Sequence, residues 1–174
     1  MVDRIRDKYK ISIDMYTPSL DSVSTMVEEN GYNLFYKAVE MRKLCCGVRN
    51  VEPALSALDA WITGLRRQQR VTRVSVPKLE IDASHGGILK LNPLADWTWD
   101  QVWEYLRANA IPYNALHDQG YPSIGCAPCT RAIEPDEDMR AGRWWWEGDP
   151  GLKECGLHEP QSPAVVGVKT GTKS

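Results

Sequence analysis

Four of the five cysteines in this 174-residue chain form two close pairs that lie far apart in the sequence. Cys45 and Cys46 are adjacent, Cys126 and Cys129 form a CxxC element, and Cys155 stands alone near the C-terminus. A CxxC element is a strong chelating unit because its two thiolates can converge on one metal centre. If both pairs serve one centre, the fold must bring two distant segments together.

The adjacent pair restricts the kind of centre. Neighbouring side chains point apart on a strand and lie about 100° apart on a helix. Cys45 and Cys46 can therefore share a centre only where the backbone turns or where the centre is large. Four-cysteine sites hold zinc or an iron–sulfur cluster, and the spacing alone favours neither strongly. The adjacent pair favours the larger four-iron cluster, and four unligated buried cysteines are the plain alternative.

Composition sets broad limits on the chain. Its length fits one domain, and its contents of 43% apolar and 25% charged residues are ordinary globular values. A net charge of −2 gives no basic field for nucleic acid, and no apolar run approaches the roughly 20 residues of a membrane span. Residues 1–14 have no apolar secretory segment, so we expect a reducing, cytoplasmic location where structural disulfides are rare.

Hydrophobic periodicity predicts an α/β protein. A helix over 19–31 has Ser19 as N-cap and Gly31 past its end, and a helix over 96–109 begins with a capping box of Thr98 and Gln101. The apolar stripe of that second helix is predicted to pack in the core. The remaining predicted elements are strands over 9–16, 60–65, 74–82 and 87–94, helices over 33–44 and 51–61, a mostly loop segment over 111–138 and a disordered tail over 159–174.

Cys155 is the spare cysteine if the two pairs fill one four-ligand site. It lies in a polar segment, and nearby cations lower the pKa of a thiol. Lys153, His158, Arg140 and Arg143 could supply that field. We therefore expect Cys155 to be a reactive nucleophile, with an incidental surface cysteine as the alternative.

Basic residues follow a predicted strand. Residues 64–73 carry four arginines, and planar guanidinium groups suit phosphate and sulfate oxygens. By itself such a run is more often a solvated face. Lys90 ends a strand before a turn, and no GxxxxGKS or GxGxxG phosphate loop occurs in the chain.

Six segments together resemble the iron–sulfur adenylylsulfate (APS) reductases, a branch of the assimilatory sulfonucleotide reductases. The resemblance covers nearly all of residues 9–158, in the family's order. The related phosphoadenylylsulfate (PAPS) reductases keep an ECGLH-type tail but lack the paired cysteines, so the resemblance favours APS as substrate. The segments are KLCCGVRNVEPAL, AWITGLRR, LKLNPLADWTWDQVW, IPYNALHDQGYPSIGCAPCTR, AGRWWWE and KECGLH.

The resemblance implies an open, mostly parallel α/β sheet with flanking helices, like that of the adenine nucleotide alpha hydrolases. Residues 1–158 would form the C-terminal portion of the reductase domain. The first strands and the family's Ser-Gly-Gly phosphate loop have no counterpart in the sequence, and residues 159–174 would be a disordered tail.

The resemblance also implies roles for single residues. Cys155 would attack the sulfur of APS, release AMP and become an S-sulfocysteine, from which thioredoxin would free sulfite for cysteine biosynthesis. The ligands of a [4Fe-4S] cluster would be Cys45, Cys46, Cys126 and Cys129. The positions matching substrate contacts are Lys90, Arg140, Arg143, the tail His158 and the basic pair Arg66 and Arg67.

One position departs from the family pattern, and two other functions remain open. The family usually has Gln-Ser after the basic pair, whereas this chain has Gln69 and Arg70, a bulky cation in place of a hydroxyl. The first alternative is a PAPS reductase, which kinetics with both nucleotides would distinguish. The second is a cluster- or zinc-binding fragment without turnover. The oligomeric state is also open, with a homo-oligomer as one possibility.

Overall fold

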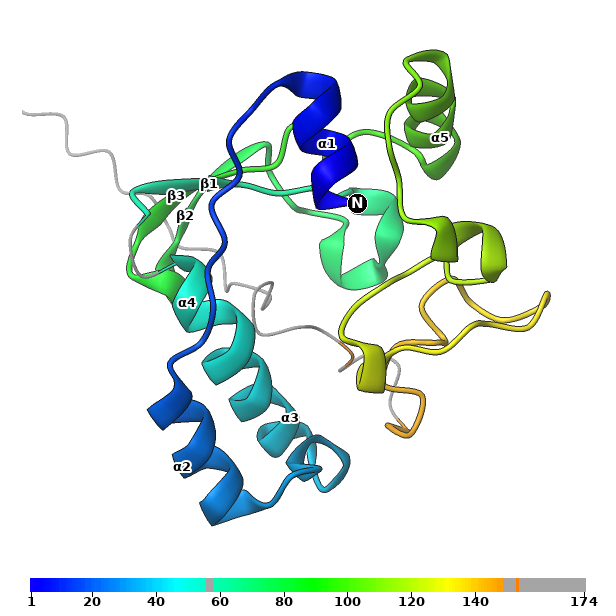
Figure 1. Ribbon diagram of the computed structural model, residues 1–174. Coiled ribbons are helices and arrows are strands. Elements are labelled where there is room, and N and C mark those ends of the chain that lie inside the picture. The colour runs from blue at the N-terminus through cyan, green and yellow to red at the C-terminus, as the bar shows by residue number, and fades with distance from the viewer. Residues whose placement is uncertain (56–57, 149–152, 154–174) are drawn as a thin grey trace, which may run out of the picture.

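The computed structural model describes residues 1–55, 58–148 and 153 (Figure 1). Cys155, His158 and the predicted tail over 159–174 lie outside these residues. No helix among the described residues is long and apolar enough to cross a membrane.

Three short strands among the described residues form one mixed sheet. They are β1 (Ala60–Ile62), β2 (Leu79–Asp82) and β3 (Ile88–Leu91), in the order β1-β3-β2. β1 runs parallel to β3, whereas β2 is antiparallel to it. The α/β class is therefore confirmed, with strands shorter than the patterns predicted and one antiparallel pair beside the parallel one.

The register of the sheet separates its two faces. Trp61, Lys90 and Glu80 are aligned across the three strands, so their side chains share one face. The buried Lys90 Nζ lies 3.1 Å from a Glu80 oxygen and 3.8 Å from a carboxylate oxygen of Asp82. This face is held by buried charges, while Ile81 on the opposite face is exposed.

Five α-helices accompany the sheet in the part of the chain that the structure describes, and two of them have side-chain caps at their N-termini. The Ser19 side chain accepts a hydrogen bond from the Ser22 N–H at 3.4 Å, and Gly31 ends the same helix with φ 86°. The capping box of Thr98 and Gln101 is present. These helix predictions are confirmed. The helices are α1 (Val2–Tyr9), α2 (Leu20–Asn30), α3 (Val39–Cys46), α4 (Glu52–Leu55) and α5 (Trp99–Ala108).

The predicted strand over 9–16 is wrong. The α1 helix ends at Tyr9, Lys10 caps it in a left-handed conformation, and residues 11–19 have no regular secondary structure. The alternation of Ile11 and Ile13 with polar residues is real, but a strand also needs a neighbour to accept its backbone hydrogen bonds. No described strand pairs with this segment.

The hydrophobic core lies between helices α2 and α3 and the C-terminal segment, away from the sheet (Figure 1). Trp146 extends this core, because its ring lies 4.3 Å from that of Tyr36 and 6.3 Å from that of Phe35. The C-terminal segment is thereby fixed against the helical part of the molecule. The buried members of the core are Met26, Leu34, Phe35, Cys129 and Trp144.

Candidate active site

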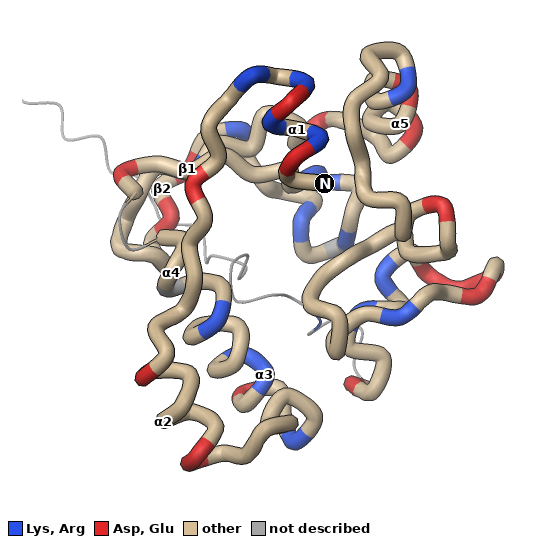
Figure 2. Tube along the Cα trace, viewed as in Figure 1, with Lys and Arg blue, Asp and Glu red and all other residues tan. Residues whose placement is uncertain are grey.

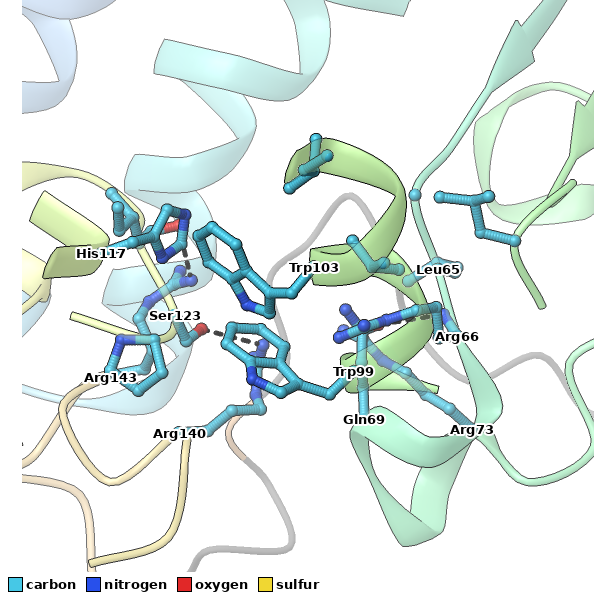
Figure 3. Close-up of a pocket in the computed structure, with 16 residues that line it drawn as sticks. Leu65, Arg66, Gln69, Arg73, Trp99, Trp103, His117, Ser123, Arg140 and Arg143 are labelled. Atoms are coloured by element: carbon cyan, nitrogen blue, oxygen red, sulfur yellow. Dashed lines mark hydrogen bonds between the residues drawn. The ribbon is translucent and has the colours of Figure 1, made fainter. Parts of the chain in front are cut away.

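A cavity of about 440 Å³ opens between three parts of the chain. Its walls come from residues 64–73 after β1, from one side of α5, and from the loop over 117–143. Figure 3 shows Arg66, Gln69 and Arg73 on one side of two tryptophan rings, with Arg140, Arg143 and His117 on the other. Figure 2 shows basic positions on both of these loop segments.

The apolar stripe of α5 lines this cavity. Trp99, Val102, Trp103 and Leu106 are all cavity residues, and no residue of α5 is fully buried. The prediction that this stripe packs in the core is therefore wrong. Helical periodicity identifies which face of a helix turns inward, but it does not say whether that face meets side chains or an open space.

Four arginines give the cavity its charge. Arg66, Arg73 and Arg143 are 4%, 6% and 9% exposed, and Arg140 is half-buried. Burial and the neighbouring Arg73 cation lower the pKa of Arg66, although a guanidinium stays charged at physiological pH. Concentrated positive charge with little water around it is costly, and a bound anion offsets that cost.

Neutral acceptors hold several of these guanidinium groups. Arg73 donates to the Gln69 side chain at 2.6 Å, and Arg66 donates to the Thr98 carbonyl at 3.4 Å. Arg143 donates to the Ile124 carbonyl at 3.2 Å. A neutral acceptor orients a guanidinium without cancelling its charge, which suits a site for phosphate or sulfate.

Two predicted substrate contacts lie away from the cavity. Lys90 belongs to the charged face of the sheet, where Glu80 and Asp82 bind its ammonium group. Arg67 forms an ion pair with Asp96 and donates to the Val76 carbonyl at 2.8 Å. The structure thus brings Arg66, Arg140 and Arg143 together and leaves Lys90 and Arg67 outside the cavity lining. Their contact with substrate stays a prediction.

The unusual Arg70 contacts the chain just before Cys155. Its guanidinium donates to the Lys153 carbonyl at 2.6 Å, and Arg140 donates to the same carbonyl at 3.3 Å. Arg70 is not among the residues that line the cavity. Arg70, the residue that departs from the family pattern, therefore binds the backbone at Lys153 and does not add a cation to the cavity wall.

Three of the four paired cysteines lie close together. Burial, followed by the neighbouring Cys126 and Cys45, raises the pKa of Cys129 to about 11, against smaller opposite effects of Arg143 and Arg42. Burial is also the main cause of the raised pKa of Cys45. The fold therefore brings the CxxC element and the adjacent pair into electrostatic contact, as the pairing predicted.

The local backbone changes where the adjacent cysteines lie. The α3 helix ends at Cys46, and residues Gly47–Val51 form a π-helical turn, a rare form that often marks functional sites. Cys46 is buried. Across the described ranges, no group of three or more His, Cys, Asp or Glu side chains is arranged to hold a metal ion.

Short-range hydrogen bonds connect the thiols to the cavity. The Cys129 carbonyl accepts a bond from the Trp144 N–H at 3.2 Å, and Thr130 forms an antiparallel bridge with Arg143. Asn50 Nδ2 approaches the Cys126 sulfur at 3.6 Å from the other side. The cavity residue Arg143 is therefore next in the chain to Trp144, whose N–H group binds the carbonyl of the predicted metal ligand Cys129.

Sequence reasoning missed several cavity residues. Arg73 lies in the basic run that the sequence reveals, but nothing separates it from Arg67 until the fold is known. Trp103 stacks edge-on against His117 at 5.4 Å, and Ser123 accepts a bond from Arg140 at 3.4 Å. A histidine or serine in a polar loop carries no periodic signal that would have identified it.

Residues 1–132 match the phosphoadenosine phosphosulfate reductase domain family. The chain belongs to this family. It is 55% identical over 161 residues to the adenosine 5'-phosphosulfate reductase of Burkholderia cepacia, a match covering 91% of this chain and 64% of that protein. It is 48% identical to the enzyme of the same name from Allochromatium vinosum, over 95% of this chain and 66% of the relative. The chain thus spans slightly less than two thirds of the length of these relatives.

A solved member of the phosphoadenosine phosphosulfate reductase family has a similar fold. The crystal structure of the PAPS reductase from Candida auris, a phosphate complex, is 32% identical and superposes with a TM-score of 0.56. The match covers 73% of this chain and 61% of that protein. It supports the expected adenine nucleotide alpha hydrolase-like fold, and the APS reductase names of the sequence relatives agree with the resemblance drawn from the motifs.

Proposed function

We propose that this chain carries the catalytic C-terminal part of an APS reductase, which converts APS to sulfite and AMP with electrons from thioredoxin. The observation that carries this proposal is the cavity in which Arg66, Arg73, Arg140 and Arg143 meet. APS has a phosphate and a sulfate group joined by one bridging oxygen, so several planar cations suit it. The relatives' names supply the reaction class.

The aromatic side of the cavity suits the nucleoside. Trp99 and Trp103 lie 5.6 Å apart in an edge-to-face arrangement, and Arg66 lies 5.3 Å above the Trp99 ring. Apolar and aromatic walls with a few convergent polar groups are typical of small-ligand sites. We infer that the adenosine part of the substrate lies against α5, with its anionic end toward Arg140 and Arg143.

The chemistry assigned to Cys155, which lies outside the described residues, is a nucleophilic displacement. Its thiolate attacks the sulfur of APS, the bond from sulfur to the bridging oxygen breaks, and AMP leaves with that electron pair. The enzyme then holds an S-sulfonate. A thioredoxin thiolate attacks the Cys155 sulfur and expels sulfite, which leaves a mixed disulfide between the two proteins. The second thioredoxin thiol then attacks the thioredoxin sulfur of that bond, closes the thioredoxin disulfide and releases the Cys155 thiol. Sulfur gains two electrons and the thioredoxin dithiol loses two.

The cavity arginines would act on charge in this displacement. Negative charge develops on the leaving phosphate, and preorganised cations stabilise such charge without further reorganisation. Arg140 is the best placed for this role, because it lines the cavity and also hydrogen-bonds to Lys153, two positions before Cys155 in the sequence. It can therefore align the anion with the chain that carries the nucleophile.

The four paired cysteines are proposed to hold a [4Fe-4S] cluster. Three observations fit this group: the mutual proximity of Cys45, Cys126 and Cys129, their partly apolar surroundings, and the Asn50 amide beside the Cys126 sulfur. When bound, such a cluster would be ligated by the four cysteines as thiolates. It would thereby link α3 to the loop over 117–143. Protein made with adequate iron should therefore contain about four irons per chain.

The direct test measures sulfite release from APS with reduced thioredoxin, using protein purified without oxygen. We expect release that depends on Cys155, and Cys155→Ser should abolish it while AMP still binds. The same assay with PAPS decides the substrate, and equal or faster turnover of PAPS would contradict the APS assignment. Iron-loaded protein that binds AMP but never forms the S-sulfonate would identify the chain as a binding fragment without turnover.

A further inference from the structure

Trp144 adopts a backbone conformation that tryptophan rarely takes. Its φ of 45° lies in the left-handed region, where bulky side chains are strained. Such strain persists only where the surrounding structure enforces it, and it concentrates at functional sites. Trp144 is also 1% exposed and is the largest fully buried side chain among the described residues.

Three guanidinium groups lie over the ring of this tryptophan, that of Arg140 at 6.0 Å from the ring centroid and two others closer to it. The central carbon of Arg42 is 4.2 Å from the ring centroid and that of Arg143 is 4.4 Å from it. Arg42 comes from α3, is fully buried and pairs with Glu147. Arg143 instead lines the anion cavity. The ring therefore contacts both Arg42, whose charge is neutralised by Glu147 inside the protein, and Arg143, whose charge faces the cavity.

The indole contributes through its π faces and not through its N–H group. The buried Nε1 of Trp144 has no hydrogen-bond partner in the part of the chain that the structure describes. An unsatisfied buried donor is costly, so the N–H group offers no reason for a tryptophan here. A desolvated cation over an indole face, by contrast, is among the stronger arrangements of this kind.

The other side of Arg143 is also closed. A Cβ added to Gly125 would overlap its guanidinium, so only glycine leaves room there. The Ile124 carbonyl accepts a hydrogen bond from Arg143 Nη1 at 3.2 Å, and the Arg143 N–H donates to the Arg140 carbonyl at 2.9 Å. The guanidinium is thus enclosed by backbone, glycine and indole, and the indole is the largest of these surfaces.

We propose that Trp144 is a positioning residue for the anion site: its electron-rich ring holds the Arg143 guanidinium in the cavity wall and fixes its distance from a bound phosphate or sulfate. This inference rests on the proposed anion-binding function. The left-handed backbone at Trp144 is what places the ring beneath Arg143 instead of beside it in the chain. The role is distinct from core filling, which any apolar side chain of similar volume would serve.

The neighbouring tryptophans provide matched controls. Trp145 is exposed and stacks edge-on with Trp146 at 4.8 Å, and no guanidinium is recorded over either ring among the described residues. Trp145 has the same chemistry as Trp144 and is adjacent to it in the chain. If a substitution weakens AMP binding only because an indole is altered, it should weaken binding similarly at Trp144 and at Trp145.

The experiment replaces Trp144 with tryptophans carrying one to four ring fluorines, inserted at that codon alone in the full, iron-loaded chain. Fluorine lowers the negative potential of the ring face while nearly preserving its size, so folding is retained. The probe is AMP, titrated calorimetrically at low and high salt. Thermal unfolding and iron content are measured on the same samples.

We expect the dissociation constant for AMP to rise stepwise with each fluorine, to about tenfold for four, as loss of a desolvated cation–π contact predicts. The loss should shrink at high salt, because it is electrostatic. Trp144→Phe should bind more tightly than Trp144→Leu. The fluorinated series at Trp145 should match the wild type.

Equal AMP affinity across the Trp144 series would overturn the inference while leaving the anion site intact. Parallel losses at Trp144 and Trp145 would also overturn it, since they would reflect a general effect. If wild-type protein fails to bind AMP at all, the proposed function fails, and the inference fails with it.

Discussion

The thiol site and the arginine cavity lie close together but treat charge in opposite ways. At the thiol site, Cys129 is packed with Phe35 and Trp144, and burial raises its pKa to about 11. In the cavity, Arg66 and Arg73 are just as buried, yet remain charged because a guanidinium does not lose its proton in this range. The same degree of burial gives neutral sulfur in one place and fixed cations in the other.

The difference shows how one loop can serve two kinds of chemistry. The loop over 117–143 supplies Cys126 and Cys129 to the thiol site and Arg140 and Arg143 to the cavity. Thiols that must bind metal gain from apolar surroundings, which exclude competing ligands. Cations that must bind an anion gain from limited water, which strengthens electrostatic attraction. Changes confined to one region should therefore leave the other largely intact.

The largest effect is expected for Cys129→Ser, which removes one of the proposed cluster ligands from the thiol site. Iron content should fall by more than about tenfold, a loss at least as large as outer-shell changes produce. Thermal unfolding should occur at lower temperature because ligation and folding are coupled. Cys155→Ser is the matched control and should keep its iron. Full iron content in the Cys129→Ser variant would show that Cys129 is not a cluster ligand.

A smaller effect, confined to the cavity, is expected for Arg140→Met. The variant loses one charged hydrogen-bond donor, so AMP affinity should fall by about 10- to 100-fold. Its iron content should stay at the wild-type level. Arg6→Met removes the same charge from the exposed surface of α1 and should bind AMP normally. Loss of iron in the Arg140 variant would contradict the separation of the two regions.

Gly125→Ala tests the boundary between the two regions. Its added Cβ would overlap the Arg143 guanidinium and push it from its place, while Gly125 has no left-handed φ that alanine would strain. AMP affinity should fall by about fivefold, part of the value of one charged hydrogen bond. Gly148→Ala meets open space and serves as control. Unchanged affinity would mean that Arg143 can shift without cost.

The smallest effect concerns the acidic side of the shared loop. Two hydrogen bonds from Arg131, at 2.6 and 2.7 Å, and a further one from the Glu134 N–H group lower the pKa of Glu137 from 4.5 to about 2. A depressed carboxyl pKa gives stability that is present above pH 4.5 and disappears as the pH falls toward 2. At pH 7, the Glu137→Gln variant should therefore unfold at a slightly lower temperature than the wild type. This difference in unfolding temperature should disappear near pH 2. A difference that is constant with pH would exclude this ion pair as its cause, and Glu134→Gln is the control.

Local features were predicted well because they depend on residues a few positions apart. The sequence predicted the N-caps Ser19 and Thr98 and the terminating Gly31, because each acts on backbone groups within three or four residues. The proximity of Cys45 to Cys129 was also predicted, but from the chemistry of paired thiols and not from local structure. The strand over 9–16 failed because its pattern could not supply a pairing partner.

The sequence by itself determined the capped ends of α2 and α5, the α/β class, the cysteine pairs and the supply of arginines. Only the tertiary structure decided where the side chains go. Lys90 and Arg73 are both buried cations, yet Glu80 and Asp82 hold Lys90 on the sheet while Arg73 lines the cavity. The α5 stripe likewise faces open space instead of core. Such outcomes depend on contacts between segments distant in the chain, whose energies no short stretch of sequence contains.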